Sequence, residues 1–403
     1  MRITVFFQHY HTPDCSTAGR PYALVERLAH EHEVTVITTD AWRTRRVTHA
    51  FDWVPHAADF VELSVPYDNA MTAGRRLRSF LQYATRAAAR ALVRAKPDLI
   101  IGSSTPLTAA AAAGGVAQTR GVPWIFEVRD LWPDFPIQMG AVPSLPARRL
   151  LYGLEHLLYR SADHVVTASP DMTRHVRTAL PPDQVSTLSY GTDFDLHARA
   201  DARDDEDLRR ELGLPDAPIV LYAGSFGRAN DIPTLLAAAR RLDDRDAVFV
   251  FAGDGYHAPA IEEAARNCAP VIRLPPQPYP RMLRIFRCAE VSVVSFIDLP
   301  VLGTNGPSKF YDSLGAGTPV VVTGNGWTRR FVEEQGCGWA VPAEAPDRLA
   351  DTIAGILDRP EALCEAGRRA RDAARTHFDR ARDMDRYAAL VARVAAKATP
   401  SRR

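Results

Sequence analysis

Long apolar runs are missing from this chain, which argues against a protein that spans the membrane with helices. No stretch of about 18 or more apolar residues occurs, so no segment predicts a transmembrane helix. The opening MRITVFFQHY leads directly into a predicted strand and lacks the cationic and apolar regions of a secretory leader. We therefore expect a cytoplasmic protein.

Cysteine is scarce and irregularly placed. The chain has 5 cysteines, an odd number without the close pairing typical of zinc sites: Cys15, Cys268, Cys288, Cys337 and Cys364. This usage indicates free thiols in a reducing compartment. We expect neither disulfides nor a metal site, and no cofactor.

An excess of charge of either sign is also missing. The 49 basic and 48 acidic residues leave a net charge of +1, so no overall field attracts nucleic acid. Hydrophobic residues make up 46% and charged residues 24%, as in ordinary globular proteins. Nucleic acid is therefore not an expected partner, and any basic patch must be local.

What the chain does contain is a repeated alternation of strands and helices. At 403 residues it is long enough for two domains. Each half alternates buried apolar runs with helical patterns, which predicts α/β architecture with two Rossmann-like, doubly wound sheets facing a cleft. The predicted strands are RITVFFQ, EVTVITT, DLIIGSS, PWIFEVR and HVVTAS, then PIVLYAG, AVFVFAGDG, VIRLPP, VSVVSF and PVVV.

The two halves meet in a polar segment near residue 195. We assign residues 1–195 to an N-terminal domain and 196–381 to a C-terminal domain. Residues 382–403 have helical periodicity.

The stretch GTNGPSKFYDSLGAGTPVV, residues 303–321, predicts a loop, a short helix and a buried strand. Gly306-Pro307 places proline at the expected first helical position, and the helix should end near residues 315–317. A helix start favours an anion, and Asp312, one turn beyond, can accept hydrogen bonds from the diol of a ribose. The alternative is that Asp312 merely favours a helix start.

Four motifs give the chain its resemblance to a known family: KPDLIIGSSTP, FEVRDLWPDFPIQMG, LYAGSFGRANDIPTLL and GPSKFYDSLGAGTPVV. Together they resemble the retaining nucleotide-sugar glycosyltransferases of family 4, which have the GT-B architecture. The likeness is greatest to bacterial O-antigen and capsule enzymes that transfer N-acetylated sugars. The resemblance also implies that the last helix, from residue 382 onward, crosses back to the N-terminal domain, so residues 382–403 are grouped with that domain.

The resemblance implies a donor site around this helix. Asp312 stands where the family has a glutamate that contacts the donor ribose. The family's other glutamate, which holds sugar hydroxyls, falls on Thr304, so Thr304 and Asn305 are expected to contact the hexose instead. That departure alters which sugar groups can be recognised. The other donor-site residues implied are Gly224, Gly306, Pro307 and Ser308.

Two basic family positions are also replaced. They fall on Ser225 and Asn230, so the resemblance leaves Arg228 and Lys309 as the cations for the diphosphate. Gly19 would let the backbone approach the phosphates. The alternatives are solvated side chains for both cations and a plain turn for the glycine.

On the acceptor side, Arg129 replaces a histidine of the family. It would face the leaving phosphate or the sugar, with Asp130 orienting it or the acceptor hydroxyl. The alternative is a buried ion pair between the two. His9 and His11 are weaker candidates for the acceptor pocket.

The predicted reaction moves a sugar from a nucleoside diphosphate, UDP by preference, to a hydroxyl acceptor with retention. Its setting would be polysaccharide or glycoconjugate biosynthesis. An epimerase or phosphorylase of the same architecture, or a non-catalytic nucleotide-sugar-binding subunit, are the alternatives. Turnover of the donor without acceptor distinguishes the epimerase.

A basic amphipathic helix is predicted at GRRLRSFLQYATRAAARALVRAK, with arginines at positions 75, 76, 78, 86, 90 and 94. Such a helix can bind anionic lipid or a lipid-diphosphate-linked acceptor at the inner face of the membrane. Its alanine spacing equally suits a helix that packs on the sheet with a solvated arginine face.

Overall fold

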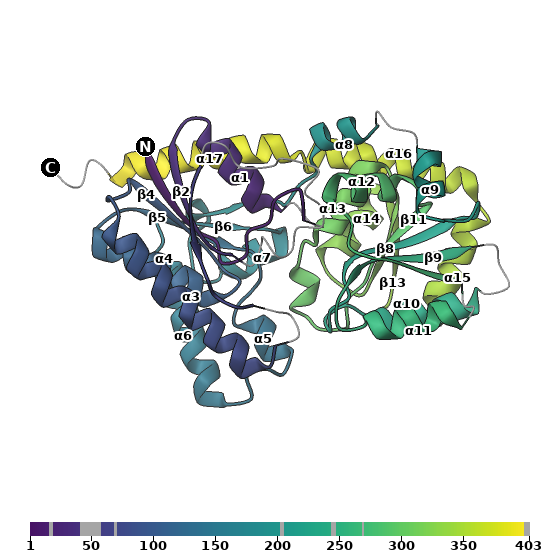
Figure 1. The fold of residues 1–403 in the computed structure, drawn as a ribbon, viewed down its shortest axis with the longest axis horizontal. Coiled ribbons are helices and arrows are strands. Elements are labelled where there is room, and N and C mark those ends of the chain that lie inside the picture. Colours follow the sequence, from purple (N-terminus) through teal and green to yellow (C-terminus); the bar gives the residue numbers. More distant parts are fainter. Residues whose placement is uncertain are drawn as a thin grey trace.

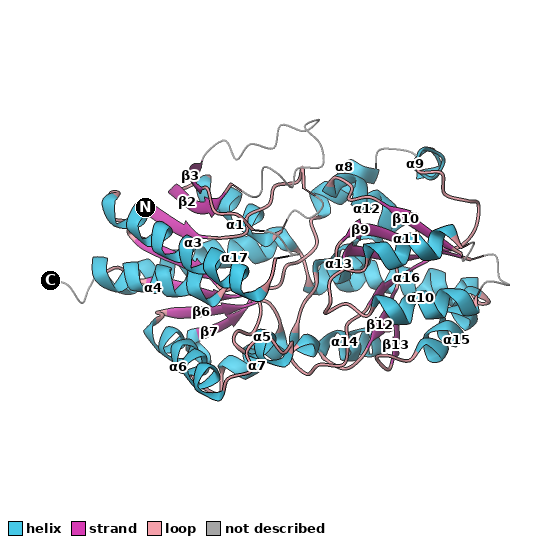
Figure 2. Ribbon diagram, turned by 60° about the horizontal axis from the view of Figure 1, so that its bottom comes forward, coloured by secondary structure: helices cyan, strands magenta, loops and turns pink. Residues whose placement is uncertain are grey.

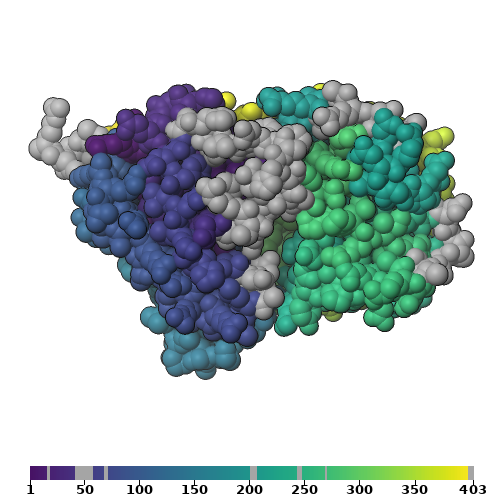
Figure 3. Space-filling view, in the orientation of Figure 1, coloured from purple at the N-terminus to yellow at the C-terminus, as the bar shows by residue number. Residues whose placement is uncertain are grey.

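The computed structural model describes residues 1–15, 19–40, 58–67, 71–201, 205–242, 247–267 and 270–398. The chain forms two α/β domains that lie side by side (Figure 1). In the space-filling view they are two lobes with an indentation between their lower parts (Figure 3).

The N-terminal domain contains a 7-stranded parallel sheet in the order β3-β2-β1-β4-β5-β6-β7. Its strands are β1 (Arg2–Phe6), β2 (Glu33–Thr39), β3 (Ala58–Leu63), β4 (Leu99–Ser103), β5 (Trp124–Val128), β6 (His164–Thr167) and β7 (Val185–Thr187). Its helices are α1 (Arg20–Ala29), α3 (Ala73–Val93), α4 (Leu107–Arg120), α5 (Asp134–Gln138), α6 (Leu145–Ser161) and α7 (Pro170–Val176), with a short 3-10 turn η1 (Pro182–Gln184).

The C-terminal domain repeats this plan with a 6-stranded parallel sheet in the order β10-β9-β8-β11-β12-β13. Its strands are β8 (Ile219–Ser225), β9 (Val248–Asp254), β10 (Val271–Leu274), β11 (Val291–Val294), β12 (Val320–Thr323) and β13 (Gly338–Val341). Its helices are α8 (Phe194–Asp201), α9 (Asp205–Glu211), α10 (Ile232–Arg241), α11 (Ala258–Arg266), α12 (Tyr279–Arg287), η2 (Leu302–Thr304), α13 (Ser308–Ala316), α14 (Trp327–Gln335), α15 (Pro346–Leu357) and α16 (Pro360–His377).

Burial explains why these residues form sheets of this kind. All residues of β4, β5, β11 and β12 are buried, as expected for strands covered by helices on both faces (Figure 2). In each domain the strand order reverses next to the first strand, between β1 and β4 and between β8 and β11. Ligands of such sheets bind beyond the carboxyl ends of the strands at this reversal.

The last helix, α17 (Arg380–Ala398), leaves the C-terminal domain and packs on the N-terminal domain (Figure 1). Its apolar face, including Tyr387 and Val391, shares a buried cluster with Ile3 and Leu24. The predicted fold class and the returning helix are therefore confirmed. The predicted domain boundaries fall in the first turns of α8 and α17.

The crossing segments are tied together by backbone hydrogen bonds. Thr192 N donates to Phe378 O at 2.6 Å, and Arg380 N donates to Thr192 O at 3.0 Å. The segment around Thr192, which leads into the C-terminal domain, and the segment around residues 378–380, which leads back, are therefore hydrogen-bonded to each other where they cross between the domains.

Candidate active site

Helix α13 lies at the centre of the predicted site, between η2 and β12. Gly306 lies two residues before the helix and is buried. A Cβ at this position would lie 2.5 Å from Tyr311 Oη, so a side chain does not fit. Pro307 occupies the N-cap, one position earlier than predicted, with Ser308 as the first helical residue. The helix ends at Gly317, whose φ of 78° is left-handed, as the glycine-rich sequence predicts.

Asp312 is almost completely buried on α13, with 4% of its surface exposed. Its Oδ1 accepts a hydrogen bond of 2.6 Å from Tyr279 Oη. Among the described residues, none donates to Oδ2, which is left for a ligand hydroxyl. Burial raises the pKa of Asp312 to about 6, although Arg380 and the Tyr279 hydrogen bond favour the charged form.

Tyr279 joins Asp312 to both domains. Its backbone N–H donates to Pro13 O at 3.2 Å and to Cys15 O at 3.1 Å, in the loop between β1 and α1. Its hydroxyl accepts from Arg380 Nη2 at 3.2 Å, and Arg380 Nη2 also donates to Gly191 O at 2.9 Å. Asp312 is thus held at the junction where the domains and the crossing segments meet.

Gly19 lies at the start of α1, as predicted, beyond the loop that contacts Tyr279. Its φ of −78° is open to any residue, so its conformation does not require glycine. His9 and His11 lie in the same β1–α1 loop, both half-buried, and the His9 ring is 4.4 Å from the Tyr67 ring. Their part in acceptor binding stays a prediction.

Lys309 lies one turn before Asp312, beside the end of β8. Its Nζ is 3.7 Å from the centre of the buried Tyr222 ring. Gly224, with a φ of 111°, passes so close that a Cβ would lie 3.5 Å from Lys309 Cε. No carboxylate of the described residues pairs with this ammonium, and burial lowers its pKa to about 7. A desolvated, unpaired cation of this kind favours binding of an anion.

Arg228 is an exposed residue of the loop after β8, with its guanidinium carbon 4.1 Å above the centre of the Tyr256 ring. The described residues offer it no carboxylate partner. Asn230 closes this loop by donating from Nδ2 to Ser225 O at 3.0 Å. Arg228 is therefore an exposed cation near a strand end, and its contact with a phosphate stays a prediction.

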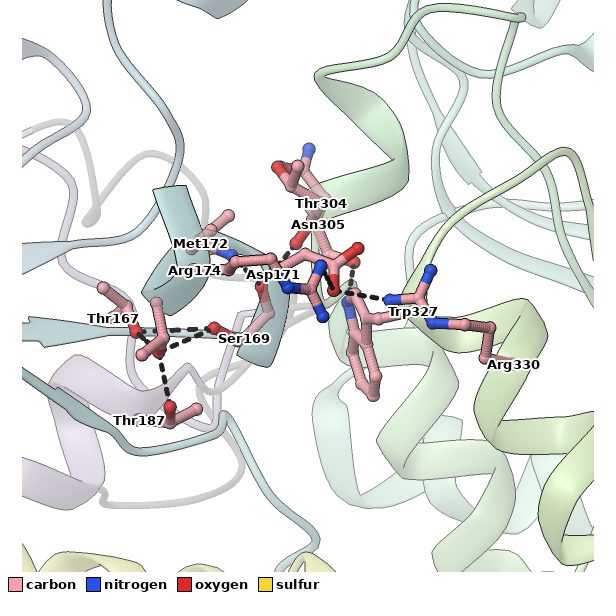
Figure 4. A network of polar contacts seen from close by, with 11 residues as sticks. Thr167, Ser169, Asp171, Met172, Arg174, Thr187, Thr304, Asn305, Trp327 and Arg330 are labelled. Atoms are coloured by element: carbon pink, nitrogen blue, oxygen red, sulfur yellow. Dashed lines mark hydrogen bonds and ion pairs between the residues drawn. The ribbon is translucent and has the colours of Figure 1, made fainter. Parts of the chain in front are cut away.

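Thr304 and Asn305 lie on the loop before α13 (Figure 4). Thr304 Oγ1 donates to Val301 O at 2.7 Å, and Thr304 O accepts 2.5 Å from Ser169 Oγ of the N-terminal domain. Asn305 O accepts from Trp327 Nε1 at 2.8 Å. The buried Asn305 Oδ1 has no hydrogen-bond partner among the described residues, and the contact of this loop with a sugar stays a prediction.

Arg129 and Asp130 do not form the ion pair considered as their alternative role. Arg129 Nε donates to Tyr190 Oη at 3.1 Å, whereas Asp130 Oδ2 accepts from Thr105 Oγ1 at 2.8 Å. Their roles toward an acceptor stay predictions. Glu127, on the same strand end, is fully buried against Arg20, 3.2 Å away, and so serves the fold.

Sequence reasoning missed the residues that hold the site from a distance. Tyr279, Ser169 and Trp327 contact predicted residues only because the fold brings separate segments together. Arg380 is linked to Asp312 through its hydrogen bond to Tyr279. None stands in a motif whose spacing marks it. Within the described ranges, no group of His, Cys, Asp or Glu side chains could hold a metal ion.

Comparison with known families decides what this site belongs to. A glycosyl transferase 4-like domain matches residues 19–191, and a glycosyl transferases group 1 domain matches residues 217–359. The chain belongs to the family 4-like, group 1 glycosyltransferases. The resemblance found in the four motifs is therefore confirmed.

Individual relatives of this glycosyltransferase family member are distant. The D-inositol 3-phosphate glycosyltransferase of Corynebacterium glutamicum is 28% identical over 207 residues, covering 48% of each chain. The match thus spans about half the length of that relative. In fold, sucrose-phosphate synthase from Thermosynechococcus elongatus matches with a TM-score of 0.75 at 20% identity, over 98% of this chain and 100% of that one. Anabaena HepE, solved with UDP-glucose, matches with a TM-score of 0.70 at 14% identity, over 97% and 99%.

Proposed function

We propose that the protein transfers a glycosyl group from a UDP-linked sugar to a hydroxyl acceptor with retention at the anomeric carbon. The observation that carries this proposal is the unpaired Lys309 ammonium beside Gly224, one turn from the half-engaged carboxylate of Asp312. A nucleoside diphosphate has an anion for the lysine and a ribose diol for the carboxylate. The UDP-glucose complex of HepE, similar in fold, and the transferase names of the relatives support it.

The donor would lie across α13. Lys309, the exposed Arg228 and the amides at Gly19 would hold the diphosphate, and Asp312 would accept hydrogen bonds from the ribose. Thr304 and Asn305 would face the hexose, which we propose to be N-acetylated or deoxy. An amide with an unused oxygen can accept from an N–H or O–H group, which suits such sugars.

In the proposed reaction the bond between the anomeric carbon and the diphosphate oxygen breaks as the acceptor oxygen bonds to that carbon on the same face. The acceptor proton passes to the leaving diphosphate. Lys309 and Arg228 stabilise the charge that grows there, so positioning and electrostatics supply the catalysis without a catalytic metal. Arg129 and Asp130 would orient the acceptor.

We further propose that the acceptor is linked to a lipid diphosphate and that the protein touches the membrane, its inner face if the protein is cytoplasmic. No helix in the described ranges is both long and apolar enough to span a bilayer, so contact would be peripheral. Apart from Met1 and Tyr256, the exposed large apolar side chains of the described residues all lie on α3 and α6: Leu77, Leu81, Leu92, Val93, Leu145, Leu150, Tyr152 and Leu157.

The charges of the same helices suit an anionic surface. Helix α3 has no acidic residue, and the only carboxylate on α6, Glu155, is buried. Apolar side chains among arginines, on helices without an exposed carboxylate of their own, are typical of helices that bind anionic lipid.

Thermal unfolding with a panel of nucleotides and nucleotide sugars tests the donor class, because a ligand that binds only the folded state raises the melting temperature. UDP and at least one UDP-sugar should raise it, and phosphate alone should not at the same concentration. Equal shifts with all nucleotides would contradict the proposed donor. Turnover of donor alone to an isomer would indicate an epimerase, and stabilisation without any hydrolysis or transfer would indicate a binding subunit.

A further inference from the structure

The loop that carries Thr304 and Asn305 belongs to the C-terminal domain by sequence but packs in the core of the N-terminal domain. We call residues 297–306 the donor loop. Val301 and Leu302 are buried to 3% and 2% exposure in the same apolar cluster as Leu131 and Met172. The loop is therefore shaped by the N-terminal domain as well as by its own domain.

Two polar contacts from the N-terminal domain fix the backbone of the donor loop. Gln138 Oε1, at the end of α5, accepts from Val301 N at 3.0 Å. Ser169 Oγ donates to Thr304 O at 2.5 Å and accepts from Met172 N at 3.1 Å, where it caps α7 (Figure 4). The Ser169 hydroxyl thus donates its proton to the donor loop and accepts a hydrogen bond from the first turn of α7.

The opposite side of the loop is held by α14. Trp327 Nε1 donates to Asn305 O at 2.8 Å. Helix α14 is itself joined to α7 by the ion pair of Arg330 with Asp171, 2.5 Å apart (Figure 4). The Asp171 side chain is mostly buried, with 11% exposed, whereas that of Arg330 is 47% exposed, so solvent screens this pair from the arginine side.

We propose that Ser169 and Gln138 are positioning residues that set the shape of the donor loop and thereby the choice of donor sugar. The inference rests on the proposed function, in which this loop faces the hexose. UDP, held by Lys309 and Asp312, does not need the loop. Loss of either contact should therefore change affinity for sugar nucleotides and leave affinity for UDP unchanged.

The test uses variants that separate the two roles of Ser169. Ser169→Asp keeps an oxygen for Met172 N but has no proton for Thr304 O, whereas Ser169→Thr keeps both. Gln138→Leu removes the acceptor for Val301 N, and Gln138→Glu retains one. Calorimetry with UDP and with UDP-glucose and UDP-N-acetylglucosamine gives the ratio of the two sugar-nucleotide affinities, and amide exchange reports the Val301 N–H directly.

We expect Ser169→Asp and Gln138→Leu to change that ratio about two- to tenfold, the effect of one net hydrogen bond, with wild-type values in the Thr and Glu variants. Val301 should exchange faster in Gln138→Leu. An unchanged ratio, or an equal loss of UDP affinity, overturns the inference while the donor class stands. A wild-type protein that binds no sugar nucleotide overturns the proposed function and the inference together.

Discussion

One carboxylate oxygen of Asp312, Oδ2, has no donor among the described residues and is left for a ligand. We assign it to the ribose, so replacing Asp312 should weaken binding of the nucleotide part that UDP and UDP-sugars share. Asp312→Ala should weaken UDP and UDP-sugars alike by about 1–3 kcal/mol, as expected for a lost hydrogen bond to a charged group. Calorimetry with UDP measures this. Unchanged UDP affinity would place Asp312 outside the nucleotide site.

Lys309 should report diphosphate binding through its proton. Since burial lowers its pKa to about 7, most of the free protein carries a neutral Lys309 at pH 8. A bound diphosphate favours the ammonium and raises that pKa, so binding at pH 8 should take up close to one proton. The enthalpy of UDP binding, measured in phosphate and in Tris buffer, gives the number of protons taken up, because the two buffers release a proton with different enthalpies.

Lys309→Arg is the matched control for this prediction. Arginine keeps the positive charge but stays protonated at all accessible pH values. It should bind UDP without proton uptake. The assignment fails if uptake persists in the variant or is absent in the wild-type protein.

Residues in the site differ in how well sequence could find them. Asp312 and Lys309 lie in one motif, so local pattern and family resemblance locate both. Tyr190, which binds Arg129, lies 61 positions away. No spacing rule covers such a contact, because it depends on how the sheet and the crossing segment come together.

At the scale of elements, α12, α13 and α17 together set the charge of Asp312. Tyr279, Arg380 and Asp193 surround it, and Tyr279 and Arg380 favour the ionised form. UDP affinity should therefore rise with pH through about 6, as the carboxylate becomes an acceptor for the ribose. In Tyr279→Phe, which lacks the hydrogen bond, the midpoint should move to higher pH.

A second tyrosine provides the control for Tyr279→Phe. Tyr152 Oη donates to Asp134 Oδ1 at 2.6 Å, on the exposed side of the N-terminal domain. Tyr152→Phe removes the same group without touching Asp312 and should leave the midpoint in place. A midpoint that stays near the wild-type value in Tyr279→Phe would show that Tyr279 does not act through this carboxylate.

The sequence predicted every strand that is buried throughout, but of the four edge strands in the described sheets it predicted only β10. Central strands such as β5 and β11 are apolar on both faces and stand out as continuous runs. The sequence did not predict β3, β7 and β13, which lie at sheet edges and include partly exposed residues. An edge strand needs fewer apolar side chains, so pattern alone leaves it ambiguous with a loop.

For the whole molecule, the charge distribution predicts reversible binding to anionic vesicles. Each exposed arginine near such a surface contributes roughly 1 kcal/mol. Changing Arg75, Arg78 and Arg90 of α3 to Glu should weaken co-sedimentation with phosphatidylglycerol vesicles by about two orders of magnitude or more. High salt should release the wild-type protein as well.

The control for this prediction is an equal change of charge elsewhere. Arg240, Arg266 and Arg348 of the C-terminal domain are exposed, and their replacement by Glu should leave vesicle binding nearly intact. Equal loss in both triple variants would indicate an effect of net charge. No sedimentation of the wild-type protein would favour a small-molecule acceptor.

The packing of α17 on α1 also has a consequence for the order of synthesis. Ile3 and Leu24, made first, share their core with Tyr387 and Val391, made almost four hundred residues later. Domains generally fold as units while the ribosome extends the chain. Here the domain begun first has an incomplete core until the last described helix has emerged, so its apolar surface stays uncovered during nearly all of translation.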